Sequence, residues 1–560
     1  MSAQIQQPQQ QVPILLLKEG TTETKGNQAQ RNNITAAKTI AEIVRTSLGP
    51  RGMDKMLVDS LGDVTITNDG ATILKEIDVQ HPAGKMMVDI SKATDSEVGD
   101  GTTSTVVIAG SLLDKAEELI SKNVHPTVVV EGFRKASQKA IETLRDIATK
   151  VDPSDKAFLN KIAKTAMASK MVGANSQELS DMVVDSVLAI AEKSGEQHYR
   201  VDIDNIKVEK KAGGSIKDTK FIHGIVLDKE VVHGGMPKRI ENAKIAVINS
   251  PLEIEKTEFD AKININSPDQ MQQFINEENR MLKAMVDKVA ATGANVLLCQ
   301  KGIDDIAQHY LAKAGILAVR RIKESDMYKL SRATGARIVN NLDELSANDL
   351  GYAKLVEERK VETDKWVFVE ECKNPKSVSI LVRGGSQRVV DEAERSVHDA
   401  IMAVKDVVEY PYVVVGGGAP EVLLSSKLRD WAATLSGRAQ LAVEKYADGI
   451  ETIPIVLAEN AGMDPLDTQV QLRSKSTSTT GRARYGVDVI NGKVADLAAK
   501  DIYEPLAVKE QVLKAATEAA CMILRIDDVI AASKPKDMPK PGGYGGPGGG
   551  MGGGMEDMDM

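Results

Sequence analysis

The segment VGDGTTSTVVIAG, residues 98–110, places an acid between two glycines and follows it with hydroxyl residues and an apolar helix. Gly99 and Gly101 permit a sharp turn with positive φ around Asp100. Because hydroxyl residues are good N-caps, one interpretation is a simple capped turn. The other is an anion site, since a helix N-terminus offers free N–H groups and the positive end of the helix dipole. A carboxylate there would repel phosphate unless a cation lay between them, which suggests Mg²⁺ bridging Asp100 and a polyphosphate.

Four other turns carry glycine or aspartate, and none is diagnostic alone. They are SLGPRG (47–52), TNDG (67–70), RGGS (383–386) and VVVGGGAP (413–420). The last is either a flexible turn or a place where backbone approaches a ligand. The sequence has no Walker A loop, GxSxG elbow, HExxH helix or catalytic Cys–His signature. A P-loop NTPase is therefore not expected.

Hydrophobic periodicity predicts the elements that carry these turns. Residues 32–50 are predicted to form a helix that stops at Gly49 and Pro50. Residues 55–74 are predicted to form a hairpin with its turn at NDG. A long helix is predicted from about Thr102 to Lys122.

Asp399 lies in a predicted helix over 386–408, opposite the apolar stripe of that helix. It shares the polar face with Arg388, Glu392 and Arg395, so periodicity alone favours a solvated surface acid. A catalytic role requires that this polar face look into a nucleotide site, and periodicity does not decide between the two.

A second amphipathic helix is predicted over 267–289, with Ser267 as N-cap and Pro268 in the first turn. A core-facing stripe is the default interpretation, and an exposed binding surface is the alternative. The stripe consists of Met271, Phe274, Ile275, Met281, Leu282, Met285 and Val289.

Composition narrows the class of protein. A chain of 560 residues is too long for one core and predicts several domains, of which the β-rich block at about 215–370 is one. The net charge of −9 and the lack of a basic patch argue against nucleic-acid binding. No apolar run approaches the ~20 residues of a membrane span, and the N-terminal segment is not expected to be a secretory signal. Cys299, Cys372 and Cys521 are predicted to be reduced core residues of a cytoplasmic protein.

Taken together, the motifs resemble those of the group II chaperonins in matching order. The resemblance covers roughly Gln11 to Ala532, and the Gly-Met tail is similar to that of archaeal thermosome subunits. The matching segments are TSLGPRGMDKMLVD, TITNDGATIL, VGDGTTSTVVIAG, VRGGS, ERSVHDAIMAV, VVVGGGAPE, LAENAGMDP and YGVDVINGKVADL. The resemblance implies a multi-domain α+β fold, with a mainly helical equatorial domain, a small α/β intermediate domain and an α/β apical domain with a helical protrusion.

The resemblance also implies domain boundaries. The equatorial domain would combine 16–150 with 410–535, and the intermediate domain would combine 151–220 with 371–409. The apical domain would be 221–370, with a lid protrusion at about 251–285. The tails at 1–15 and 536–560 are expected to be disordered because their composition is glutamine-rich and glycine-rich.

The resemblance assigns roles to individual residues. Asp100 would bind Mg²⁺, Asp399 would orient or deprotonate the attacking water, Asp69 would help place that water, and Lys170 would sense the γ-phosphate. The other nucleotide-binding residues that it implies are Leu48, Gly49, Pro50, Gly101, Thr102, Thr103, Ser104 and Ser169 around the phosphates, Gly417 by the ribose, Glu504 and Lys509 at the ribose and base, and Asp488 and Val494 near the adenine.

The expected function is that of an ATP-dependent chaperonin subunit with ATP/ADP and Mg²⁺ as ligands. Its expected partners are other chaperonin subunits in stacked rings and unfolded polypeptides, without nucleic acid or membrane. One alternative is a structural or filament-forming oligomer that binds ATP without folding activity. The other is a metabolic phosphotransferase, for which the sequence supplies no acceptor pocket.

Overall fold

The computed structural model describes residues 22–170, 176–195, 198–254, 267–373, 375–478 and 483–531. The chain divides into two compact units, a small one formed by its two ends (Met1–Arg31 and Ile526–Met560) and a large one over Asn32–Arg525. In the small unit, β1 (Thr22–Lys25) pairs antiparallel with β21 (Asp528–Ala531), and the Gly26 N–H donates to the Asp527 carbonyl at 2.7 Å.

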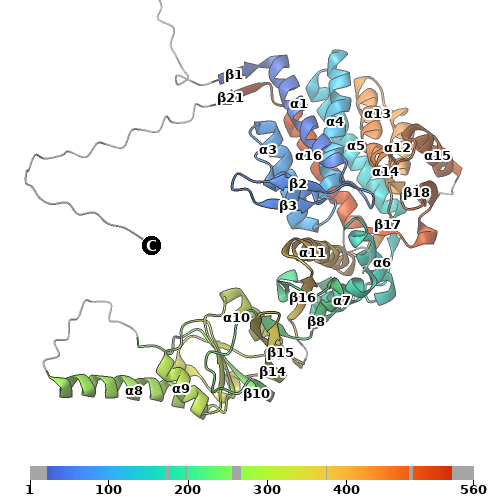
Figure 1. The fold of residues 1–560 in the computed structure, drawn as a ribbon. Coiled ribbons are helices and arrows are strands. Elements are labelled where there is room, and N and C mark those ends of the chain that lie inside the picture. Colours follow the sequence, from blue (N-terminus) through green and yellow to red (C-terminus); the bar gives the residue numbers. More distant parts are fainter. Residues whose placement is uncertain are drawn as a thin grey trace, which may run out of the picture. The chain divides into compact units, whose positions relative to one another are not determined.

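The first core of the large unit is helical and is built from both halves of the sequence. Figure 1 shows helices from the blue and orange parts of the chain packed side by side. Its aliphatic residues come from 34–144 and from 414–524. The helices are α1 (Gly26–Arg45), which belongs to this unit from Asn32 onward, α2 (Gly70–Glu76), α3 (Pro82–Val98), α4 (Thr102–Ser121), α5 (Pro126–Ile147), α12 (Ala419–Ala432), α13 (Arg438–Ile450), α14 (Thr452–Asn460), α15 (Pro465–Ser478) and α16 (Leu506–Leu524).

Short antiparallel strands surround this helical core. One hairpin joins β2 to β3 and another joins β18 to β19, while β17 pairs with both β4 and β20. The strands are β2 (Lys55–Val58), β3 (Val64–Thr67), β4 (Thr149–Lys150), β17 (Tyr412–Val415), β18 (Tyr485–Asp488), β19 (Lys493–Asp496) and β20 (Tyr503–Pro505).

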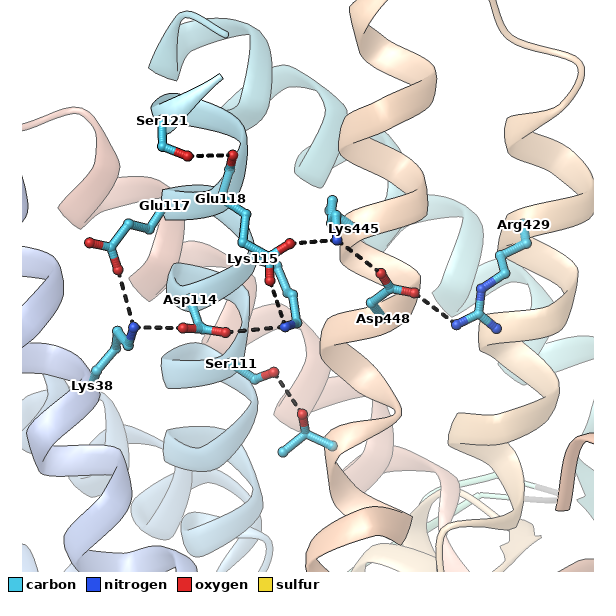
Figure 2. A network of polar contacts seen from close by, with 11 residues as sticks. Lys38, Ser111, Asp114, Lys115, Glu117, Glu118, Ser121, Arg429, Lys445 and Asp448 are labelled. Atoms are coloured by element: carbon cyan, nitrogen blue, oxygen red, sulfur yellow. Dashed lines mark hydrogen bonds and ion pairs between the residues drawn. The ribbon is translucent and has the colours of Figure 1, made fainter. Parts of the chain in front are cut away.

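A chain of ion pairs links α1, α4, α13 and α12 (Figure 2). Lys38 on α1 binds Asp114 on α4 at 2.6 Å, and Glu118 on α4 binds Lys445 on α13 at 2.6 Å. Asp448, one turn further along α13, accepts from Arg429 on α12 at 2.9 Å. These pairs are partly exposed, so each contributes little to the stability of the fold.

The second core joins α6 (Lys156–Met167), α7 (Ser176–Ile190) and α11 (Gln387–Glu409) to a small sheet. In that sheet β16 (Val378–Gly384) lies between β7 (Ile206–Ala212), to which it is parallel, and β8 (Lys220–Ile222). A two-residue pair, β5 (Glu192–Lys193) and β6 (Tyr199–Arg200), lies nearby in the sequence.

The third core surrounds a mixed sheet of order β12-β11-β10-β14-β15-β9, with β13 (Ile338–Val339) beside β10. The strands are β9 (Ile225–Leu227), β10 (Arg239–Ile248), β11 (Val296–Cys299), β12 (Leu317–Val319), β14 (Gly351–Val361) and β15 (Asp364–Glu370), and the helices are α8 (Pro268–Ala291), α9 (Asp305–Lys313) and α10 (Glu324–Thr334). Short 3-10 turns occur at 203–205, 216–218, 342–344, 347–349 and 498–500.

The predicted α+β fold class is confirmed, and the long helix predicted from Thr102 ends at Ser121. The domain boundaries stay a prediction. Two local predictions are wrong. The first helix ends at Arg45 rather than at Gly49, and the 55–67 hairpin turns at 59–63 rather than at NDG. NDG instead begins α2, because the Asp69 carboxylate caps that helix.

All three cysteines are buried and free, as predicted. Helix α8 begins after Ser267 as predicted, but its apolar stripe divides. Met271, Phe274 and Ile275 are exposed, whereas Leu282 and Val289 are buried in the third core. The predicted protrusion at 251–285 includes residues 255–266, which lie outside the described residues. Within the part of the chain that is described, none of the helices is both long and apolar enough to cross a bilayer.

Candidate nucleotide site

A cavity of about 970 Å³ opens between the first and second cores of the large unit. Every predicted site residue except Val494 lines it. They are Leu48, Gly49, Pro50, Asp69, Asp100, Gly101, Thr102, Thr103, Ser104, Ser169, Lys170, Asp399, Gly417, Asp488, Glu504 and Lys509. Val494 is buried in the helical core and does not line the cavity; Val487, Val489 and Ile490 of the same hairpin line it instead.

The turn before α4 has the geometry of an anion site. Gly99 and Gly101 are both left-handed, with φ of 65° and 78°, and they place Asp100 between the end of α3 and the start of α4. Gly101 is the N-cap and has no side chain to satisfy the N–H groups of the first turn. These groups and the helix dipole therefore face the cavity, where they can bind phosphate.

Three glycines let backbone line the cavity closely. A Cβ at Gly101 would lie 2.6 Å from Val512 Cγ2, and one at Gly49 would lie 2.3 Å from Leu457 Cδ2. A Cβ at Gly417 would lie 2.2 Å from Leu497 Cδ1. All three have positive φ, so glycine is required both by conformation and by space.

Asp69 is fixed by the start of two helices. Its Oδ2 accepts from the Thr72 N–H at 2.8 Å, which caps α2, and its Oδ1 accepts from Thr102 Oγ1 at 3.1 Å. Burial raises the pKa of Asp69, but the charge of Lys170 and the Thr72 hydrogen bond outweigh it, so the pKa lies below its usual value. Asp69 is therefore a preorganised carboxylate at the cavity wall.

Lys170 and Asp399 form a buried ion pair. The Lys170 Nζ donates to Asp399 Oδ2 at 2.5 Å, and the side chains are 6% and 12% exposed. Burial lowers the pKa of Lys170, but the negative charges of Asp399 and Asp69 raise it above its usual value. The ammonium thus lies between two carboxylates from different elements.

Asp399 is not a solvated surface acid, so the interpretation from periodicity is wrong. Asp399 and Glu392 on the polar face of α11 are 8% and 4% exposed. Asp399 pairs with Lys170 at the cavity wall, whereas the apolar stripe of α11 shares the second core with α6. Periodicity locates a polar face but does not say whether that face meets water or a polar cavity.

Asp100 is the acid best placed to bind a cation. Its Oδ1 accepts from the Gly101 N–H at 2.6 Å. Burial, and then the negative charge of Asp399, raise the pKa of Asp100 to about 6. A carboxylate held in this way gains from a divalent cation, which compensates the neighbouring negative charge.

A buried charge cluster joins α16, β20 and α12 at the cavity wall. The Lys509 Nζ contacts Glu504 at 2.7 Å and Glu421 at 2.8 Å. Burial lowers the pKa of Lys509, but the two carboxylates raise it above its usual value. Asp488 accepts from Lys500 and from Asn491, which keep its pKa below its usual value against the effect of burial.

Several lining residues were not found from the sequence. Asn68 donates its Nδ2 to the Ser169 carbonyl and so joins the end of β3 to the loop that carries Lys170. Its position beside Asp69 in TNDG was the available signal. Asn160, Lys161 and Lys164 on α6 also line the cavity, and their spacing on one helix face was the signal for them.

These groups fit a magnesium nucleotide. Mg²⁺ commonly binds through one or two carboxylates together with phosphates and water, and Asp100 beside the N-terminus of α4 supplies that donor set. Among the described residues, no group of three or more His, Cys, Asp or Glu is arranged to hold a metal, and such a site needs none. Beside the turn before α4, Asp69 and Asp399 add two carboxylates that can act as bases. Lys170 adds a cation.

Comparison with known proteins identifies the family. The model of the TCP-1/cpn60 chaperonin family matches residues 40–534. The chain is 58% identical to the thermosome subunit alpha of Archaeoglobus fulgidus over 523 residues, which are 93% of this chain and 95% of that protein. It is 55% identical to a thermosome subunit of Pyrococcus horikoshii over 547 residues, 98% of this chain and 99% of that protein. The predicted resemblance is confirmed, and the chain belongs to the TCP-1/cpn60 chaperonin family.

Proposed function

We propose that this chain is the subunit of a double-ring, ATP-driven folding chamber and that it hydrolyses ATP in the cavity described above. The observation that carries the proposal is the meeting of Asp100, Asp69, Lys170 and Asp399 at one cavity, although they lie in four separate segments of the sequence. Similarity to thermosome subunits supports the chaperonin assignment.

In the proposed mechanism the α4 N-terminus binds the phosphates of ATP and Asp100 holds Mg²⁺. When bound, the metal neutralises phosphate charge and orients the γ-phosphoryl group. Asp69 orients the attacking water, and Asp399 orients it or accepts its proton. Lys170 binds the γ-phosphate as a point charge and stabilises the charge of the transition state.

The coupling to folding follows from where Asp399 lies. Helix α11 directly follows β16 of the second core, and its C-terminal end leads into β17 beside the first core. A tilt of the second core would therefore move Asp399 relative to Asp100 and couple hydrolysis to lid closure over a captured polypeptide. The exposed apolar start of α8 is the proposed contact for that non-native polypeptide.

We place the chain in the cytoplasm because its three cysteines are buried and free. The test of function combines two assays on the purified oligomer. Phosphate release from ATP must require Mg²⁺, and a denatured enzyme must regain activity only with hydrolysable ATP. Assembly with ATP binding but without recovery of the enzyme would favour the alternative, a structural or filament-forming oligomer.

A further inference from the structure

His398 precedes Asp399 on α11, and its ring turns back toward that neighbour. Its Nδ1 lies 3.9 Å from Asp399 Oδ1, the oxygen that Lys170 does not bind. Successive residues on a helix point about 100° apart, so side chains at i and i+1 do not ordinarily face each other. The imidazole is about half exposed, whereas Asp399 is buried.

The C-terminal turn of α3 faces the same side of α11. A Cβ at Gly99 would lie 2.3 Å from Met402 Cγ, which shows how closely the two helices approach. Asp95 lies one turn before Gly99 on α3, and His398 lies one turn before Met402 on α11. Asp95 and His398 are close enough for the charge of each to shift the pKa of the other.

The electrostatics agree with this placement. Contact with Asp399, together with the charges of Asp95 and Glu394, raises the pKa of His398. Burial, and then the charges of Asp69 and Asp399, raise the pKa of Asp95 to about 6, which His398 and Lys170 partly oppose. The acids around the imidazole, on its own helix and on α3, all favour its charged form.

We propose that His398 is a positioning residue for ATP hydrolysis: its imidazolium holds one oxygen of Asp399 while Lys170 holds the other. This inference rests on the proposed function, in which Asp399 orients or deprotonates water. A carboxylate with two oxygens can rotate about its Cβ–Cγ bond. Contacts on both oxygens fix the plane of the group, and such preorganisation raises the rate without changing substrate affinity.

The proposal has a pH signature. The imidazolium is present at low pH and is lost as the pH rises through the raised pKa of His398, above its ordinary value of about 6.5. The kcat of the unmodified protein is therefore expected to fall roughly threefold to tenfold across that range. The KM for ATP is expected to stay constant, because His398 does not line the cavity.

The experiment measures kcat and KM for ATP from about pH 6 to about pH 9 on assembled oligomers. His398→Gln removes the charge, and the expected result is a low kcat without the fall in kcat with rising pH. His398→Lys retains a charge, and the expected result is a kcat that stays high to alkaline pH. His309→Gln, on α9 away from the cavity, is the matched control for loss of a histidine and is expected to keep the unmodified profile.

Asp399→Asn separates this inference from the proposed function. If Asp399→Asn loses turnover while His398→Gln retains the unmodified kcat and pH profile, His398 has no positioning role and the proposed function stands. If Asp399→Asn retains full turnover, the proposed role of Asp399 fails, and with it the inference. A fall in kcat for His398→Gln that His398→Lys does not restore would also overturn the proposal.

Discussion

The Nζ of Lys170 lies 2.5 Å from Asp399 Oδ2, and this buried pair joins the loop after α6 to the middle of α11. Asp399→Asn keeps the size of the side chain but removes its charge. We expect ATP to bind with an affinity within a few-fold of the unmodified protein, while turnover falls by about 100-fold or more. ATP affinity and phosphate release, measured on the same preparation, check this. Unchanged turnover would remove Asp399 from the reaction.

Lys170→Met leaves Asp69 and Asp399 buried without their cation. Breaking a buried ion pair from one side costs about 3–5 kcal/mol, so we expect lower stability to denaturant as well as lower turnover. Lys156→Met is the control, because Lys156 is on α6 and pairs with Asp185 at an exposed site. Its expected cost is below about 1 kcal/mol. Equal stability losses in the two variants would contradict the account.

Gly101→Ala places a Cβ 2.6 Å from Val512 at a positive φ, so the phosphate turn must deform. We expect ATP affinity to fall about tenfold or more, because the first-turn N–H groups are misdirected. Gly293→Ala is the matched control. Gly293 also has a positive φ, but a Cβ added there would have no atom within 4 Å. Calorimetric titration measures the ATP affinity of both variants. An equal loss of affinity in the two would show that backbone strain alone causes the effect.

Asp406 on α11 is buried with an unpaired Oδ2, and burial raises its pKa to about 8. An unfolded aspartate titrates near 3.9, so between about pH 4 and pH 8 the folded state holds a proton that the unfolded state has lost. Stability therefore falls as the pH rises through this range. Asp406→Asn is expected to raise the melting temperature by about 2–5 °C at pH 8, with a smaller gain near pH 5.

The control for this prediction is Asp287→Asn, at an exposed position on α8. It is expected to leave the melting temperature unchanged at both pH values. A melting temperature of the Asp406→Asn variant that shifts equally at pH 5 and pH 8 would show that Asp406 is already ionised in the folded state.

The exposed start of α8 carries the proposed polypeptide contact. Replacing Met271, Phe274 and Ile275 with serine is expected to weaken binding of a denatured protein about tenfold and to leave ATP turnover intact. Gln272→Ser with Asn276→Ser changes the exposed polar residues of the same turns as a control. Light scattering measures how well each of the two variants suppresses aggregation of the denatured protein. Equal suppression by both variants would show that the polypeptide contact lies elsewhere.

The turn around Asp100 could be predicted because its signal is local: two glycines, an acid and the start of a helix. The burial of Asp399 could not be predicted, because its partner Lys170 lies 229 residues earlier in the sequence. The proposed role of Asp399 in orienting or deprotonating water came only from the resemblance to the chaperonin family. The hairpin turn was misplaced for a local reason, since NDG favours a turn but Asp69 is better satisfied as a helix cap.

The helical core also depends on contacts between distant parts of the sequence. Periodicity predicts α1, α4 and the apolar residues that they bury, but it does not show that 34–144 and 414–524 share one core. The glycines at 49 and 417 are recognisable as turns, whereas their close approach to Leu457 and Leu497 depends on that long-range pairing.

A structure of the oligomer with Mg²⁺, ADP and a planar phosphate mimic such as aluminium fluoride would show whether this cavity binds and hydrolyses ATP. We expect Mg²⁺ on Asp100, phosphate oxygens at the Gly101–Ser104 turn, and Asp399 and Lys170 beside the mimic. A nucleotide bound elsewhere, or bound in this cavity with Asp399 still paired only to Lys170 and out of reach of the mimic, would contradict this expectation.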